Sequence, residues 1–294
     1  MLYRGGSAVA GALPRVVALA IATVAGQAAS RLLPGRDAIV RSNLAHVVGA
    51  LPKREMDRLV RRSFVEYARY WALAAHFSGV AVRDPTRLVT VTGREHYVEA
   101  MKRGGVIFAV PHVGLWDAGG IVSKMEGFSI ATVAEEAANP RLTAFFERQR
   151  HRLGLDSFPP GPETTTALIA RLRDHGAVAL VADRDVIGDG IDVPFFGEKT
   201  KMPTGPVVLA LRSGATLLPS AVLIRPGGRV EVAIGDPLSL ERRGRLREDV
   251  ERLTADLVAR YEVIIRNNPE QWHVFQPIWP GRDATPEDQT EPAA

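Results

Sequence analysis

Short apolar runs alternate with helical patterns between Leu88 and Ile234, and this alternation constrains the fold more than any other feature. The runs expected to form strands are 88–92, 106–110, 129–133, 177–181, 216–224 and 229–234. The segments between them with helical periodicity are 95–103, 115–125, 141–152, 167–173 and 206–212. Helical crossovers place successive strands parallel and cover both faces of a sheet. The sequence therefore predicts an α/β fold: a single domain with a mixed, largely parallel sheet flanked by helices.

Further helices are expected on both sides of this region, at 36–50, at 53–77 and in a long final helix through 250–264. The second has an apolar stripe at spacings of three and four, typical of a helix packed on a core. We therefore assign 36–279 to one α/β domain with N-terminal helices. Residues 280–294 are rich in proline and acidic residues, and we expect this tail to be disordered.

Residues 1–35 contain few charges, but their most apolar run, 16–25, is short. A membrane-spanning helix needs about 20 apolar residues. We predict a helix that lies in a membrane interface, with a packed core helix and a signal peptide as the alternatives. The net charge of +4, the pI of about 9.6 and the excess of arginine favour an anionic membrane surface as partner. No zinc-finger, RNP-type or basic-zipper pattern occurs, so nucleic acid is not an expected partner.

The strongest chemical signal follows the apolar run 106–110. His112 comes after Pro111, and Gly114 and Asp117 follow. Ligands of open α/β sheets bind beyond the carboxyl ends of the strands, where His112 is expected. A carboxylate bonded to one imidazole nitrogen fixes the tautomer and makes the other nitrogen a general base. We therefore predict His112 as the base and Asp117 as its partner, with His112 on a turn so that Asp117 can fold back.

A second polar group follows the run 177–181. It consists of Asp183, Arg184 and Asp185, and about twenty residues without a clear element then extend to Thr204. Long loops are often functional, and Arg184 is suited to hold a phosphate. A buried ion-pair network is the equally open alternative. Phe195 and Phe196 would either line an acyl groove or anchor the loop in the core.

Other enzyme classes lack their signatures. There is no Gly-x-Ser-x-Gly elbow, no Gly-x-Gly-x-x-Gly after a strand and no P-loop. The absence of cysteine removes thiol nucleophiles and cysteine metal sites, and the histidines show no metal-ligand spacing. A lipid-binding protein without catalysis is the remaining alternative from another class.

Several ordered blocks resemble the lysophospholipid and lipid A late acyltransferases, whose hallmark is His-x4-Asp/Glu after a buried strand. Besides His112 and Asp117, the blocks are Arg41-Ser-Asn-Leu44, Leu180-Val-Ala-Asp-Arg-Asp185, Val193-Pro-Phe-Phe-Gly197 and Met202-Pro-Thr-Gly205. The end, Asn268-Pro-Glu-Gln-Trp272-His-Val-Phe-Gln276, resembles the subgroup that acylates phosphatidylinositol mannosides.

The resemblance implies substrate-binding roles for Asp183, Arg184 and Asp185, and places Glu135 and Arg150 near the acceptor. Close neighbours compete for the last two roles, namely Glu136, Arg148 and Arg152. In some members a carboxylate from the loop after the second strand holds the histidine instead of the aspartate of the motif. The candidates here are Asp183, Asp185, Asp192 and Glu198.

The implied reaction is a one-step transfer of palmitoyl from acyl-CoA to a glycolipid acceptor, the 6-position of a mannose on phosphatidylinositol mannoside. Acyl carrier protein is the alternative donor, and lysophosphatidic acid and a lipid A precursor are the alternative acceptors. No cofactor and no metal are expected besides the acyl-CoA co-substrate. The resemblance and the apolar N-terminal run together predict a peripheral or monotopic enzyme on the cytoplasmic face of the inner membrane.

Overall fold

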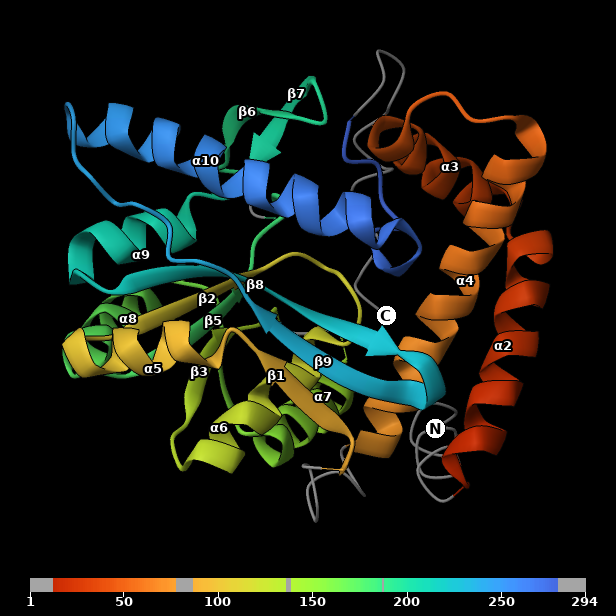
Figure 1. The fold of residues 1–294 in the computed structure, drawn as a ribbon, viewed down its shortest axis with the longest axis horizontal. Coiled ribbons are helices and arrows are strands. Elements are labelled where there is room, and N and C mark those ends of the chain that lie inside the picture. The colour runs from red at the N-terminus through yellow and green to blue at the C-terminus, as the bar shows by residue number, and fades with distance from the viewer. Residues whose placement is uncertain (1–12, 78–86, 136–138, 187, 280–294) are drawn as a thin grey trace.

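The computed structural model describes residues 13–77, 87–135, 139–186 and 188–279, and its centre is a seven-stranded sheet (Figure 1). The strand order is β1-β9-β8-β2-β5-β3-β4, and every neighbouring pair is parallel except β8 and β9. The strands are β1 (Val89–Thr92), β2 (Val106–Val110), β3 (Ile130–Val133), β4 (Leu155–Phe158), β5 (Ala177–Val181), β8 (Thr216–Arg225) and β9 (Arg229–Ile234). The predicted fold class is confirmed.

Alternating side chains of the central strands form two apolar cores, one on each face of the sheet. Residues Ile107, Val178 and Leu217 point to one face, and their neighbours Val106, Ala177 and Leu218 point to the other. The first face is covered by α8 (Pro162–Arg173), α9 (Gly205–Ser213) and α10 (Leu246–Asn267). The second is covered by α5 (Arg94–Arg103), the 3-10 turn η3 (Trp116–Gly120) and α6 (Ile121–Glu126). Side chains on both faces of β2 are therefore buried away from solvent, which agrees with its unbroken apolar sequence.

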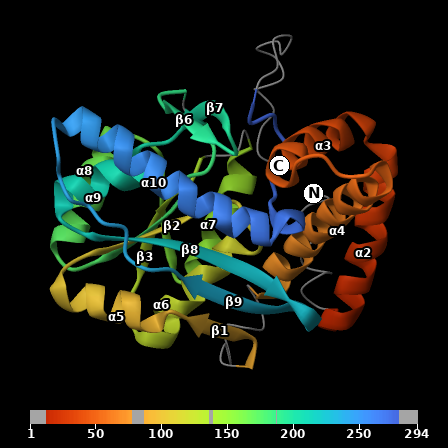
Figure 2. The same ribbon diagram turned by 45° about the horizontal axis from the view of Figure 1, so that its top comes forward.

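The N-terminal helices stand at the end of the sheet where β2 and β5 finish (Figures 1 and 2). They are α2 (Arg15–Leu32), α3 (Pro34–Val48) and α4 (Lys53–His76). The helices α2 and α4 pack closely at Gly26, where any Cβ would meet the backbone of Phe64. Within the described residues, no single helix is long and apolar enough to cross a membrane, although α2 and α3 together pass by length and composition as a pair bent by 97°.

Two features of the fold were not predicted. The edge strand β4 has only one buried residue, Leu155, so it lacks a strand-like apolar pattern. The segment before Thr204 was expected to be a loop, which is wrong in part: it contains the antiparallel hairpin β6 (Ile191–Phe195) and β7 (Glu198–Met202). The sequence did not indicate this hairpin, because Pro194 and the alternating charged residues are not typical of strands. Residues 1–12 of the predicted membrane segment and the predicted disordered tail, 280–294, lie outside the described residues.

The remaining short elements complete the chain around the sheet. They are α7 (Pro140–Leu153), the 3-10 turn η4 (Pro226–Gly228) and the 3-10 turn η5 (Pro269–Gln271). The helix α7 connects β3 to β4, and η5 joins α10 to the C-terminal segment 272–279. This last segment returns to the sheet, where Val113 and Trp272 form an isolated antiparallel bridge. The start of this C-terminal segment, Trp272, therefore reaches the carboxyl end of β2.

Candidate active site

His112 lies on the turn directly after β2, as its position in the sequence predicted. Gly114 makes this turn possible, because its φ is +63° and any Cβ would collide with the carbonyl oxygen of Val222 on β8. The neighbouring Leu115 donates its N–H to that same oxygen at 2.8 Å. The backbone after β2 is thus tied to the sheet, and the His112 side chain, about 20% exposed, is held over the strand ends.

The carboxylate that holds His112 belongs to Asp183, which is fully buried. Asp183 accepts a bond from the His112 ring, with Nδ1 to Oδ1 at 2.5 Å, and another from the His112 backbone N–H at 3.0 Å. The Trp272 indole N–H donates to the same carboxylate at 2.8 Å. With Nδ1 engaged in this way, Nε2 is the ring nitrogen left to exchange a proton with a substrate.

Burial alone would raise the pKa of Asp183. The opposing attraction to His112 and the bonds from His112 and Trp272 outweigh burial, so the pKa of Asp183 lies below its usual value. The carboxylate is therefore ionised at neutral pH and acts as a permanent acceptor for the imidazole N–H. A buried anion with three donors is a rigid support for a base.

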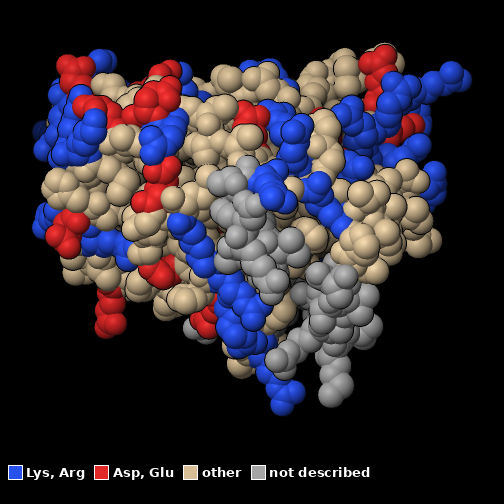
Figure 3. Space-filling model, turned by 60° about the horizontal axis from the view of Figure 1, so that its bottom comes forward, with Lys and Arg blue, Asp and Glu red and all other residues tan. Residues whose placement is uncertain are grey.

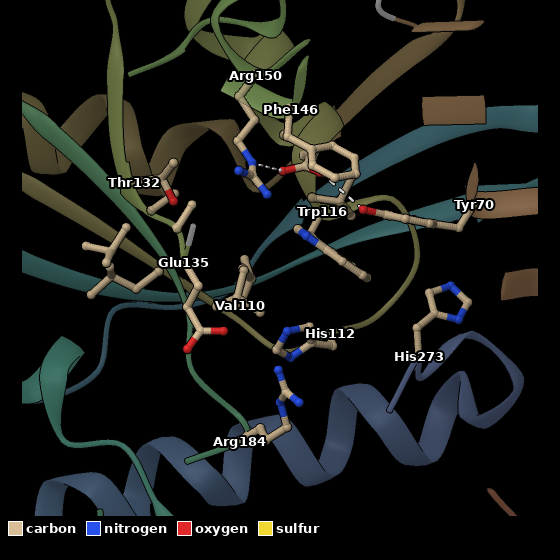
Figure 4. A pocket seen from close by; sticks show the side chains of 18 of the residues that line it. Tyr70, Val110, His112, Trp116, Thr132, Glu135, Phe146, Arg150, Arg184 and His273 are labelled. Carbon is tan, nitrogen blue, oxygen red and sulfur yellow. Dashed lines mark hydrogen bonds and ion pairs between the residues drawn. The ribbon is translucent and has the colours of Figure 1, made fainter. Parts of the chain in front are cut away.

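Asp117, predicted as the partner of His112, has other contacts. Its carboxylate accepts a bond from the Tyr70 hydroxyl at 3.1 Å and forms an ion pair with Arg150 Nε at 3.3 Å, drawn as dashed lines in Figure 4. The expectation that Asp117 folds back onto the His112 ring is corrected, because η3 directs its side chain toward α4 and α7. Burial, and then the nearby charge of Asp117, raise the pKa of Tyr70 well above its usual value, so Tyr70 is a neutral donor.

A cavity of about 1410 Å³ opens beside His112. Part of its wall is apolar and lies between the sheet and the η3–α6 segment, with lining residues Phe108, Val110, Val122, Ile130, Leu155, Val222, Val232 and Ile234. Gly119 and Gly120 also line this part, and their lack of a Cβ lets the side chains of Val222 and Leu155 pack closely against η3. The dimensions and lining suit one or more alkyl chains, since binding cavities for drug-sized ligands are about 300–1,000 Å³.

The polar end of the cavity gathers most of the predicted substrate-binding residues. Glu135, Arg150, Arg184 and Asp185 all line it, and Figure 4 shows three of their side chains around His112. Arg184 donates to the neutral side chain of Gln276 at 2.7 Å, so no carboxylate neutralises it through that bond. Asp185 accepts two backbone N–H groups of its own loop.

Among the described residues, the alternative candidates for the roles of Glu135 and Arg150, and for the partner of His112, do not reach these positions. Glu136 is outside the described residues, and Arg148 and Arg152 are exposed on α7 without lining the cavity. Asp192 pairs with Lys201 across the β6–β7 hairpin, and Glu198 meets His46, so neither reaches His112. Phe195 is fully buried and stacks on Trp279, which favours the core-anchor interpretation over an acyl groove.

Three residues of the site had no role in the sequence-based prediction. Tyr70 was not singled out at all, and Trp272 and His273 were only part of the C-terminal resemblance. The sequence feature that could have indicated their role is the polar atom on each ring, because such an atom needs a hydrogen-bond partner when its segment is buried. No group of three or more potential metal-binding side chains occurs among the described residues.

Comparisons with known proteins show the family to which the chain belongs. The family model described as bacterial lipid A biosynthesis acyltransferase matches residues 1–280. The chain is 32% identical over 284 residues to the phosphatidylinositol mannoside acyltransferase of Mycolicibacterium smegmatis, covering 94% of this chain and 90% of the relative. It is 33% identical over 249 residues to the enzyme of the same name from Mycobacterium tuberculosis, covering 82% and 76%. The protein is therefore an acyltransferase that belongs to the bacterial lipid A biosynthesis acyltransferase family.

Proposed function

We propose that the protein transfers a long-chain acyl group, palmitoyl, from acyl-CoA to a mannose hydroxyl of a phosphatidylinositol mannoside. The observation that carries this proposal is the position of His112, which is held by buried Asp183 on the wall of a cavity with an apolar and a polar end. The apolar end suits the acyl chain, and the polar end suits a sugar. The names of the two similar mycobacterial relatives support this acceptor.

In the proposed step, Nε2 of His112 removes the proton from the acceptor hydroxyl as its oxygen attacks the thioester carbonyl. Asp183 keeps the imidazole in the tautomer that can accept this proton and stabilises the imidazolium that forms. When the C–S bond breaks, the thiolate of coenzyme A takes the proton from His112. A positioned base of this kind contributes about 10²–10⁴-fold to a rate.

The other polar residues have positioning roles in this proposal. Arg184 offers its charge to a phosphate of the donor or acceptor, because its partner Gln276 is neutral. Arg150, oriented by Asp117, and Glu135 would bind acceptor hydroxyls at the opposite wall. No cofactor is needed besides acyl-CoA, because the transfer exchanges a thioester for an ester without net oxidation or reduction.

The test is transfer of labelled palmitoyl from its CoA ester to phosphatidylinositol mannoside, lysophosphatidic acid and a lipid A precursor. Wild type should acylate the mannoside, and His112→Ala should lose most of that activity. Near-normal transfer by His112→Ala would overturn the mechanism. Acylation of only one of the other acceptors would overturn the acceptor, and turnover only with acyl carrier protein would overturn the donor.

We further propose that the enzyme binds the cytoplasmic face of the inner membrane as a peripheral or monotopic protein. Helix α2 presents apolar side chains to solvent, with Val16 76%, Ile21 55% and Val24 68% exposed. Figure 3 shows many basic side chains on one face of the molecule, which anionic lipids attract by about 1 kcal/mol each near the surface. Flotation with anionic vesicles at low salt should recover the protein, and its absence from the vesicle fraction would overturn the proposal.

A further inference from the structure

His273 occupies a fixed place beside the base. Its backbone N–H donates to the carbonyl oxygen of His112 at 2.8 Å, so the two residues are joined directly. Its side chain is 6% exposed and lies among the rings of Tyr67, Tyr70 and Trp116, with centroids 5.4, 5.6 and 6.0 Å away. The residue lines the large cavity, and Figure 4 shows its ring near His112 and Trp116.

The imidazole of His273 has unused hydrogen-bonding capacity. Both ring nitrogens are buried, and neither has a hydrogen-bond partner among the residues that the structure describes. The nearby Tyr70 hydroxyl is directed to Asp117 and does not satisfy them. A buried polar group without a partner destabilises the folded state. Such a ring on the wall of a substrate cavity is stabilised when a ligand atom supplies the missing partner.

His273 also has the charge state of a hydrogen-bond donor that does not exchange protons. Burial, reinforced by the charge that His112 can carry, lowers the pKa of His273 to about 3. The ring is therefore neutral at physiological pH, with one N–H donor in either tautomer. It also stays neutral when His112 takes up a proton. Enzymes use neutral imidazoles with depressed pKa values to polarise carbonyl groups.

We propose that His273 donates a hydrogen bond to the carbonyl oxygen of the acyl thioester and stabilises the oxyanion formed during transfer. This inference rests on the proposed acyl transfer. As the acceptor oxygen bonds to the carbonyl carbon, its proton passes to His112 and the carbonyl π electrons move onto the oxygen that His273 binds. When the C=O bond re-forms, the C–S bond breaks and the thiolate takes the proton from His112.

The test compares His273→Phe, which keeps a ring but has no N–H, with His273→Gln, which keeps a neutral donor. Each variant is assayed for palmitoyl transfer to the mannoside and, without acceptor, for hydrolysis of palmitoyl-CoA by water. Removing one oxyanion donor costs about 10²–10³-fold in kcat. His273→Phe should lose that much in both reactions with little change in either KM, and His273→Gln should regain part of the rate. The matched control, His96→Gln on α5, should behave as wild type.

Folding of each variant is checked by its melting temperature and near-ultraviolet circular dichroism. A second measurement does not depend on altering His273: palmitoyl-CoA labelled with ¹³C at its carbonyl is bound to His112→Ala. The infrared carbonyl stretch should move to lower frequency than in solution, because the N–H of His273 polarises the bond. Unchanged hydrolysis by folded His273→Phe, a change in acceptor KM alone, or an unshifted carbonyl band would each overturn the inference. If wild type neither transfers nor hydrolyses the thioester, the proposed function itself fails.

Discussion

Replacing Asp183 by Asn tests whether Asp183, and not Asp117, is the carboxylate that supports His112. The amide keeps the shape of the side chain, but it cannot accept all three bonds that Asp183 receives, and its NH₂ group faces donors. Each lost bond to a charged group costs about 1.5–3 kcal/mol. The amide also favours the wrong imidazole tautomer, and the same change in Ser-His-Asp enzymes lowers kcat by about 10⁴-fold. We therefore expect Asp183→Asn to lower the melting temperature and to reduce kcat by roughly this factor.

The assay is palmitoyl transfer under saturating substrates, with thermal unfolding measured on the same samples. Asp192→Asn is the matched control, because its side chain is 61% exposed and pairs with Lys201 across the hairpin. The pKa of Asp183 lies below its ordinary 3.8, so its ionisation stabilises the fold above that pH. This contribution to stability is lost as the pH falls through the pKa that Asp183 has in the folded state. The stability of Asp183→Asn should not show this fall at low pH. A folded Asp183→Asn enzyme with wild-type kcat would refute the reasoning.

Three further changes test other parts of the structure. Asp117→Asn should raise the KM for the acceptor more than it lowers kcat, because it weakens the ion pair that positions Arg150; steady-state kinetics would show the reverse if Asp117 supported the base. Gly93→Ala should destabilise the fold by about 1–3 kcal/mol in urea unfolding, because its φ is +71° and a Cβ would meet the Ile234 carbonyl oxygen. Ile21→Asp should reduce vesicle flotation while leaving the melting temperature unchanged, because this side chain is 55% exposed.

The sequence was sufficient to predict six of the seven strands of the sheet and the place of His112, because these follow from apolar runs and the polar residues after them. It was not sufficient to decide which carboxylate holds His112. That choice depends on strand register: Val110 on β2 pairs with Val181 on β5, so residues 112 and 183 come to the same level. Sequence separation of 71 residues concealed this pairing, whereas Asp117 is close in sequence but is turned away by η3. To predict which side chains meet when they follow different strands, the strand register must be known, and a single sequence does not show it.

The C-terminal segment 272–276 contributes more to the site than its distance from His112 in the sequence suggests. Its contacts join Trp272 to Asp183, His273 to His112, Phe275 to Arg36 and Gln276 to Arg184. The segment therefore contacts Asp183, His112 and the two cations Arg36 and Arg184 of the cavity wall, and these groups belong to three different parts of the chain. Because α10 and η5 deliver this segment to the strand ends, the hydrogen bonds around His112 and Asp183 are complete only when α10 has packed on the sheet.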